Sequence, residues 1–282
     1  MRKRSFLCSA AILALLFVSS ACDRKGETKP AGGENTADTV SVQMEYRDTL
    51  GKSELSCFMK GALPNTDNKQ LKKIINEWIN ERLGGVYKME DPLNSNAILD
   101  FYQKRWVDST TVVVKELASL GDYSPDCTGD TQFKVMAESK KYISLSITSY
   151  CYEGGAHGGT VVSQQTFRKE DGRELGWNNM FNDENKYRLT DIIQKGLAEY
   201  FKVKPGEDVR DYLLLSDGSS FIPLPETPPV LLKDGVGFVY QQYEIAAYAM
   251  GMPRFVIPYS EIKPLLTTTA LSLIEEETDD KL

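Results

Sequence analysis

Histidine, excess positive charge and long apolar runs are all scarce in this sequence of 282 residues. The single histidine, His157, excludes sites that bind a metal through several histidines and leaves at most one imidazole for catalysis. Acidic residues outnumber basic ones by 40 to 33, which gives a formal charge of −7. Because nucleic-acid binding needs a clustered cationic surface, we expect no nucleic-acid partner. The 41% hydrophobic and 26% charged residues are typical of a folded, acidic protein.

The one extended apolar stretch, from Phe6 to Val18, follows the basic residues 2–4. It is shorter than the roughly 20 residues that a membrane-spanning helix needs, and it is typical of the core of a secretory signal. Small residues at 19–21 then lead into Cys22, as in a bacterial lipoprotein signal. We therefore predict a lipoprotein signal peptide at 1–21 and a lipidated Cys22 that anchors the chain to a membrane. The alternative is ordinary cleavage after Ala21, which leaves a free thiol.

Residues 22–39 contain Gly, Thr, Glu, Lys and Pro with no apolar periodicity, so we predict a flexible tether. Removal of the signal takes away three basic residues and no acidic ones, which makes the formal charge −10. The expected location is the bacterial cell envelope, on the periplasmic face or the outer-membrane surface.

Three cysteines remain beyond the anchor: Cys57, Cys127 and Cys151. In an oxidising compartment they would allow one disulfide, either Cys127–Cys151 or Cys57–Cys127. The alternative is that all three are small buried hydrophobes. Both interpretations stay open from the sequence.

Apolar periodicity places the first half of the fold. Loose alternation over 40–63 predicts one or two strands. Helical spacing from Leu71 to Leu83 predicts a helix with Asp67 as N-cap and an end at 84–85. A second helix is expected over 95–106.

In the second half of the sequence, the pattern of apolar and polar residues indicates both strands and helices. We predict strands over 132–138, 142–152, 161–167, 237–246 and 255–258, and helices over 188–201 and 259–266. Strands and helices come in blocks, which favours an α+β fold of mostly antiparallel sheets packed with a few helices. The expected body has two parts, an N-terminal subdomain at 40–130 and a C-terminal subdomain at 131–270. An acidic tail follows at 271–282.

The stretch from Glu153 to Gly159 is the part of the sequence that comes nearest to a reactive site. Four glycines around His157 permit unusual backbone angles and close approach to a ligand. Glu153 would orient the ring, but no nucleophile is indicated, so we predict no catalytic residue. The structural alternative is a tight inter-strand turn. We propose Glu153, Gly154, Gly155 and His157 as ligand contacts.

Tyrosines are concentrated near the C-terminal end of the predicted 237–246 strand. Tyr240, Tyr243 and Tyr248 predict a recognition surface, since tyrosine offers a large contact area at low entropic cost. The alternative is that some of them fill the core. We include all three among the predicted ligand contacts.

No metal or cofactor is predicted. The carboxylates Asp122, Asp126 and Asp130 lack the alternating ligand pattern and the terminal glutamate of a calcium loop. The fragment Gly235-Val-Gly237 is not followed by a glycine-rich helix start, so it is no nucleotide-binding fingerprint.

Two motifs together resemble a known family. They are Tyr150-Cys-Tyr-Glu-Gly-Gly-Ala-His-Gly-Gly159 and Tyr243-Glu-Ile-Ala246, the latter followed by Val256-Ile-Pro-Tyr-Ser-Glu-Ile262. They resemble the extracytoplasmic domain of the lysozyme-sensing anti-sigma factors of Gram-positive bacteria. A similar module occurs as an accessory region in some peptidoglycan deacetylases and in uncharacterised bacterial lipoproteins. The resemblance covers roughly residues 40–268.

This resemblance implies extracytoplasmic recognition of a cell-wall hydrolase such as lysozyme. Sigma-factor capture is not expected, because only five residues precede the apolar stretch. We therefore expect a non-enzymatic binding module for a basic, lysozyme-like hydrolase or a peptidoglycan fragment. The alternative is a hydrolase or transferase that acts on wall material through His157.

Overall fold

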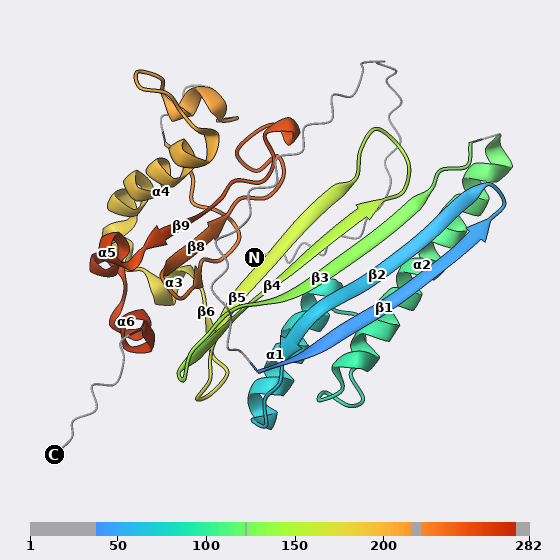
Figure 1. Cartoon of the computed structure of the whole chain (residues 1–282), viewed down its shortest axis with the longest axis horizontal. Coiled ribbons are helices and arrows are strands. Elements are labelled where there is room, and N and C mark those ends of the chain that lie inside the picture. Colours follow the sequence, from blue (N-terminus) through green and yellow to red (C-terminus); the bar gives the residue numbers. More distant parts are fainter. Residues whose placement is uncertain (1–37, 122, 216–220, 275–282) are drawn as a thin grey trace.

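The computed structural model describes residues 38–121, 123–215 and 221–274. The predicted signal peptide, the lipidated Cys22 and most of the tether lie outside the described residues. Two sheets with their helices form the body, as Figure 1 shows. The predicted α+β class with a two-part body is confirmed.

The larger sheet has six strands in sequence order and is antiparallel except between its second and third strands. These strands are β1 (Thr39–Leu50), β2 (Ser53–Pro64), β3 (Cys127–Glu138), β4 (Tyr142–Tyr152), β5 (Gly159–Arg168) and β6 (Glu174–Leu175). Two helices, α1 (Lys69–Leu83) and α2 (Ser95–Leu120), connect the parallel pair and cover one face of the sheet. Alternate residues of each strand therefore pack against these helices or point to the opposite side.

The predicted α1 helix is confirmed, with one correction at its start. Its N-cap is Asn68 rather than Asp67, because the Asn68 side chain accepts a hydrogen bond from the backbone N–H of Leu71 at 3.1 Å. Gly84 and Gly85 end the helix with positive φ angles, as expected for a helix stop.

Helix α2 begins at Ser95 as predicted but continues well past residue 106, to Leu120. The β-branched residues at 110–114 have a lower intrinsic preference for the helix. Thr110 and Val114 are nevertheless buried against the sheet, and this packing outweighs the unfavourable local propensity.

The second body holds a three-stranded antiparallel sheet of β7 (Val230–Leu231), β8 (Gly235–Val239) and β9 (Arg254–Pro258). Its helices are α3 (Trp177–Met180), α4 (Lys186–Phe201), α5 (Tyr259–Ile262) and α6 (Thr268–Ile274). Short 3₁₀ helices lie at Asp183–Asn185, Val209–Tyr212, Tyr248–Met250 and Lys263–Leu265. The strand predicted over 237–246 ends at Val239. Beyond it the chain turns away from the sheet, and this turn carries the tyrosines.

The two bodies meet along β5 and at the start of β4. The hydroxyl of Ser144 donates to the carbonyl of Leu231 at 2.6 Å, and the side chain of Gln164 donates to the carbonyl of Pro228 at 2.9 Å. The subdomain boundary predicted at 130/131 falls within β3, whereas the two sheets separate after β6. The composition changes near residue 130, but the hydrogen bonds between strands continue across it.

Among the described residues, none of the helices combines the length and apolarity needed to span a bilayer.

Candidate functional site

Glycines shape the loop that joins β4 to β5, between residues 153 and 158. Gly154 and Gly155 have φ angles of +89° and +102°, which non-glycine residues rarely adopt. A Cβ at Gly154 would lie 2.7 Å from the Cβ of Pro125, and the N–H of Gly155 donates to the hydroxyl of Tyr123 at 3.1 Å. The loop is therefore fixed against the connection between α2 and β3.

His157 is exposed on this loop, and its ring is held by three contacts. Its Nδ1 lies 3.0 Å from the carbonyl oxygen of Gly158, which can only accept, so Nδ1 carries the proton. In the neutral ring Nε2 then accepts from the hydroxyl of Tyr243 at 3.3 Å. The ring stacks on Tyr248 with centroids 4.0 Å apart and an interplanar angle of 23°. These residues, His157, Tyr243 and Tyr248, are called the aromatic cluster below.

The loop that carries both tyrosines is docked on the edge of β5 by two glutamines. The Gln241 side chain accepts from the N–H of Val162 at 3.1 Å and donates to its carbonyl at 2.7 Å. The Gln242 side chain accepts from the N–H of Thr160 at 2.8 Å. These amides satisfy backbone groups that a neighbouring strand would otherwise pair.

Tyr243 is one of three non-glycine described residues with a positive φ angle, +62°. Its side chain is 56% exposed, so burial of the ring does not account for this conformation. Backbone strain at an exposed side chain is typical of functional positions.

Tyr150 extends the cluster on the sheet and was not among the ligand contacts predicted from the sequence. A Cβ at Gly158 would lie 2.4 Å from the Tyr150 ring, so only glycine allows this approach. The hydroxyl of Tyr248 donates to the carbonyl of Gly158 at 3.1 Å. Burial raises the pKa of Tyr150, and the nearby phenol of Tyr248 raises it further. The sequence feature that could have identified Tyr150 is its position in the predicted strand 142–152, two residues before Tyr152 and close to the glycine loop.

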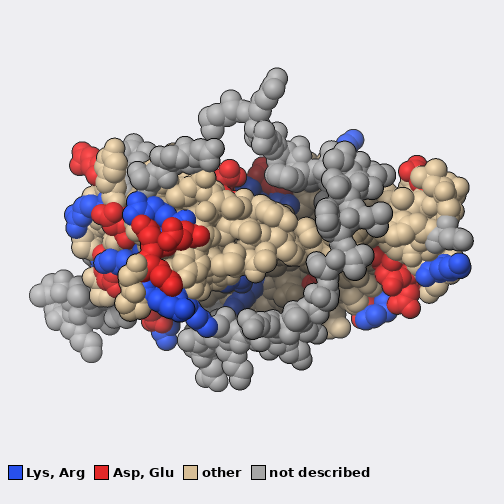
Figure 2. Space-filling model, turned by 90° about the horizontal axis from the view of Figure 1, so that it is seen from above, with Lys and Arg blue, Asp and Glu red and all other residues tan. Residues whose placement is uncertain are grey.

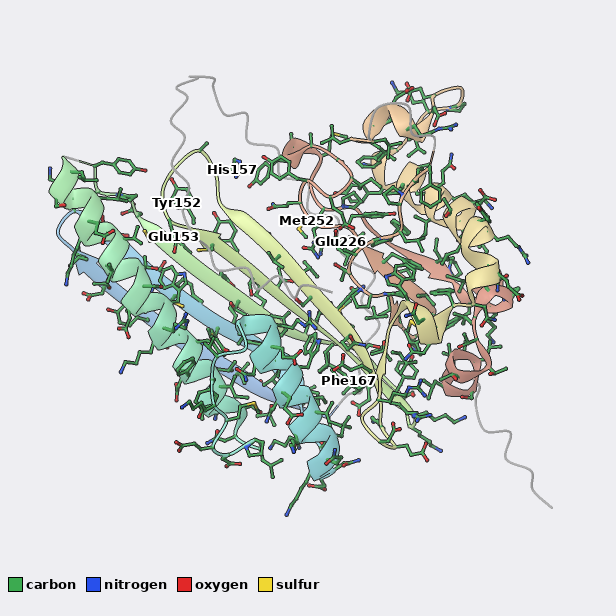
Figure 3. The ribbon with its side chains drawn as sticks, turned by 180° about the vertical axis from the view of Figure 1, so that it is seen from behind. Tyr152, Glu153, His157, Phe167, Glu226 and Met252 are labelled. Carbon is green, nitrogen blue, oxygen red and sulfur yellow. The ribbon has the colours of Figure 1, made fainter. Side chains whose placement is uncertain are left out.

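Two predicted contacts lie elsewhere. Tyr240 is 0% exposed, and its hydroxyl donates to the carbonyl of Pro223 at 2.7 Å, so it is a core residue and is withdrawn as a ligand contact. Burial raises its pKa strongly. Glu153 accepts from the hydroxyl of Thr110 on α2 at 3.4 Å and does not orient His157. Figure 3 shows Glu153 toward α2 and His157 toward the second body.

The arrangement is suited to contact rather than to proton transfer. Among the described residues, no carboxylate, serine or cysteine is hydrogen-bonded to the His157 ring, whose two nitrogens face Gly158 and Tyr243. The same residues contain no group of three or more His, Cys, Asp or Glu side chains that could hold a metal ion. A general base would need a partner within hydrogen-bond reach.

Cys57 and Cys127 are free, buried thiols, so neither disulfide considered from the sequence forms. Burial raises their pKa values to about 12 and about 11, respectively. For these two residues the alternative of small buried hydrophobes is correct.

The molecule is thus an α+β protein whose two bodies meet beside a glycine-rich hairpin and an aromatic cluster. Residues 178–260 match the family described as "Protein of unknown function (DUF3298)". This match includes Tyr243 and Tyr248 but begins after His157.

Two solved structures share the fold. A member of the DUF3298 family from Bacteroides fragilis NCTC 9343 has a TM-score of 0.70 at 23% identity, covering 86% of this chain and 98% of that one. A DUF3298 family protein from Pseudomonas aeruginosa PAO1 has a TM-score of 0.60 at 15% identity, covering 84% and 97%.

One curated relative is a peptidoglycan-N-acetylmuramic acid deacetylase, PdaC, from Bacillus subtilis strain 168. It is 24% identical over 140 residues, which are 49% of this chain and 29% of the deacetylase. With the DUF3298 matches, this relation confirms the family resemblance drawn from the sequence.

Proposed function

We propose that this chain is a lipid-anchored protein of the bacterial envelope and a non-enzymatic binding module for cell-wall glycan. The observation that carries the proposal is the aromatic cluster. Its three rings adjoin one another, His157 and Tyr243 are exposed, and Tyr243 has a strained backbone; among the described residues, none of the three is hydrogen-bonded to a carboxylate, serine or cysteine. Sugar rings present apolar faces that pack on aromatic side chains, while their hydroxyls pair with nearby polar groups.

The deacetylase relative supports the wall as the site of action, because its printed name places its substrate in peptidoglycan. The shared segment is a minor part of that protein, which fits an accessory module better than a catalytic one. Lipidation at Cys22 would hold this module close to the wall, and the tether would extend its reach.

The test is binding of peptide-free glycan chains, released from peptidoglycan, to the full-length chain by isothermal titration calorimetry. We expect His157→Ala and Tyr243→Ala each to weaken binding about tenfold, the equivalent of ~1.4 kcal/mol. Tyr187→Ala is the matched control, because Tyr187 is 81% exposed on α4, away from the cluster. Absence of binding by the wild-type chain, or equal losses in the control, would refute the proposal.

A second candidate partner is a basic cell-wall hydrolase of the lysozyme type, favoured by the formal charge of −10 that remains once the predicted signal peptide, with its three basic residues, is removed from the chain of charge −7. A negative surface raises the association rate with a basic protein and makes it sensitive to salt. Figure 2 shows acidic and basic side chains interspersed on the face in view rather than one acidic field. Titration with lysozyme at two salt concentrations tests this partner, and a salt-insensitive result would remove it.

The same samples address the enzymatic alternative. Release of shortened or modified glycan by the wild-type chain, lost in His157→Ala with folding and binding intact, would favour a hydrolase or transferase. We expect the glycan to be recovered unchanged.

A further inference from the structure

The face of the larger sheet opposite α1 and α2 carries a row of side chains that the aromatic cluster does not include. Phe58 on β2 pairs with Asp130 on β3, which pairs with Tyr150 on β4. Paired residues share a face, and adjacent strands lie about 4.8 Å apart. All three side chains are half-buried. This row therefore places a carboxylate directly beside the tyrosine that contacts Gly158.

Asp130 has one satisfied and one unsatisfied carboxylate oxygen. Its Oδ2 accepts from the ammonium of Lys60 at 2.8 Å, whereas Oδ1 is buried without a hydrogen-bond partner among the described residues. The side chain as a whole keeps 22% exposure, although Oδ1 itself has almost none, so a ligand that reaches the carboxylate must turn the side chain to meet this oxygen. An unpaired buried acceptor is costly, and a donor from a ligand would remove that cost.

Phe58 contributes to the row by holding cationic side chains over its ring. The guanidinium of Arg47 lies 4.9 Å from the centroid of its ring, and the ammonium of Lys60 lies 5.5 Å from it. The ring is therefore occupied by cations and helps to hold Lys60 beside Asp130. Arg47 pairs in turn with Glu45, so the charges along this part of the sheet cancel.

The row is continuous with the aromatic cluster. Tyr150 contacts Gly158, and the carbonyl of Gly158 accepts from Tyr248, which stacks on His157. A path of polar and aromatic groups thus runs from the middle of the sheet to the loop of the second body. We call it the tyrosine track, and its members are Lys60, Asp130, Tyr150, Tyr248, His157 and Tyr243.

We propose that the tyrosine track binds consecutive sugar rings of one extended glycan chain, an inference that rests on the proposed function. Tyr150 and the aromatic cluster would pack on sugar faces, the Asp130 carboxylate would turn to accept from a sugar hydroxyl, and Lys60 would donate to a sugar oxygen. A peptide would be expected at a strand edge, where backbone groups are free, rather than on a face. A basic protein would be expected at uncompensated carboxylates, and here the charges are paired.

The test compares glycan chains of two, four and six sugars on the full-length protein by calorimetry. Because the track is longer than one sugar, we expect wild-type affinity to rise at least tenfold from two to six sugars. Asp130→Ala and Tyr150→Leu should abolish most of this rise while changing the affinity for two sugars by less than about twofold. Tyr243→Ala should weaken binding at every length.

Two controls keep the result interpretable. Lys134→Ala changes an exposed residue of β3 on the same face, outside the track, and should leave the length dependence intact. Asp130→Asn preserves size if Asp130→Ala fails to fold, and it should reduce the rise by at least threefold. If wild type binds glycan and Tyr243→Ala weakens it, but Asp130 and Tyr150 variants keep the full length dependence, the track is refuted and the proposed function stands. If wild type binds no glycan, both are refuted.

Discussion

The two faces of the six-stranded sheet are built from the same strands but differ in what their side chains do. On the helix-covered face, Leu55, Met59, Leu145 and Phe167 are almost fully buried, Leu55 in a small apolar cluster and the other three in a larger one. On the opposite face, Ser144 and Gln164 are buried against the second body, whereas the part that this body leaves uncovered carries half-exposed polar and aromatic groups such as Tyr150. Strand alternation thus separates the residues that stabilise the fold from those available for binding. A substitution should therefore change either stability or binding, according to its face.

The largest expected effect is on the helix-covered face. Phe167 is 0% exposed and meets the ring of Trp78 edge-on, with centroids 5.7 Å apart. Phe167→Ala should lower the free energy of unfolding by about 3–5 kcal/mol, through lost burial and the cavity it leaves. Lys134→Ala on the opposite face should change it by less than about 0.5 kcal/mol. Urea denaturation followed by circular dichroism measures both, and equal losses would contradict the division between faces.

An intermediate effect is expected where the second body meets β5. Gln241→Ala removes the hydrogen bonds to Val162 and one to the hydroxyl of Thr227 at 2.6 Å. The freed groups should lower the free energy of unfolding by about 1–3 kcal/mol. The loop that carries Tyr243 would also lose its support, so glycan affinity should fall. Gln194→Ala on α4 is the control, and it should alter neither quantity. A stable variant with normal binding would show that the loop holds its position without these bonds.

Local periodicity predicted most of the fold, because it depends on residues close in sequence. The α1 helix and the strands at 142–152 and 161–167 follow from spacing alone. Errors arose where contacts between residues distant in sequence determine the structure. Helix α2 extends through Thr110 because the sheet packs on it, and Tyr240 is buried in the core of the second body.

The candidate site was predictable only in part, for the same reason. His157 was indicated by its glycines and Tyr243 by tyrosine density. Asp130 and Tyr150 belong to the track only through strand register, which pairs residues 20 apart in the sequence. Glu153 is only four residues from His157, yet the glycine-rich turn between them separates the two side chains, and Glu153 pairs with Thr110 on α2.

The smallest change in the free energy of unfolding is expected at Tyr243. A substitution there tests most directly whether an exposed residue contributes to binding rather than to stability. The φ of +62° at this position costs a tyrosine about 1 kcal/mol, whereas asparagine adopts this region more readily. Tyr243→Asn should therefore leave the free energy of unfolding within about 0.5 kcal/mol of wild type, because relief of strain offsets the lost bond to His157. Glycan affinity should fall about tenfold in calorimetry, since the exposed ring is gone. Tyr187→Asn should leave affinity unchanged. If Tyr243→Asn instead destabilises the protein by more than about 1 kcal/mol, the ring is structural and the strain at this position has no role in binding.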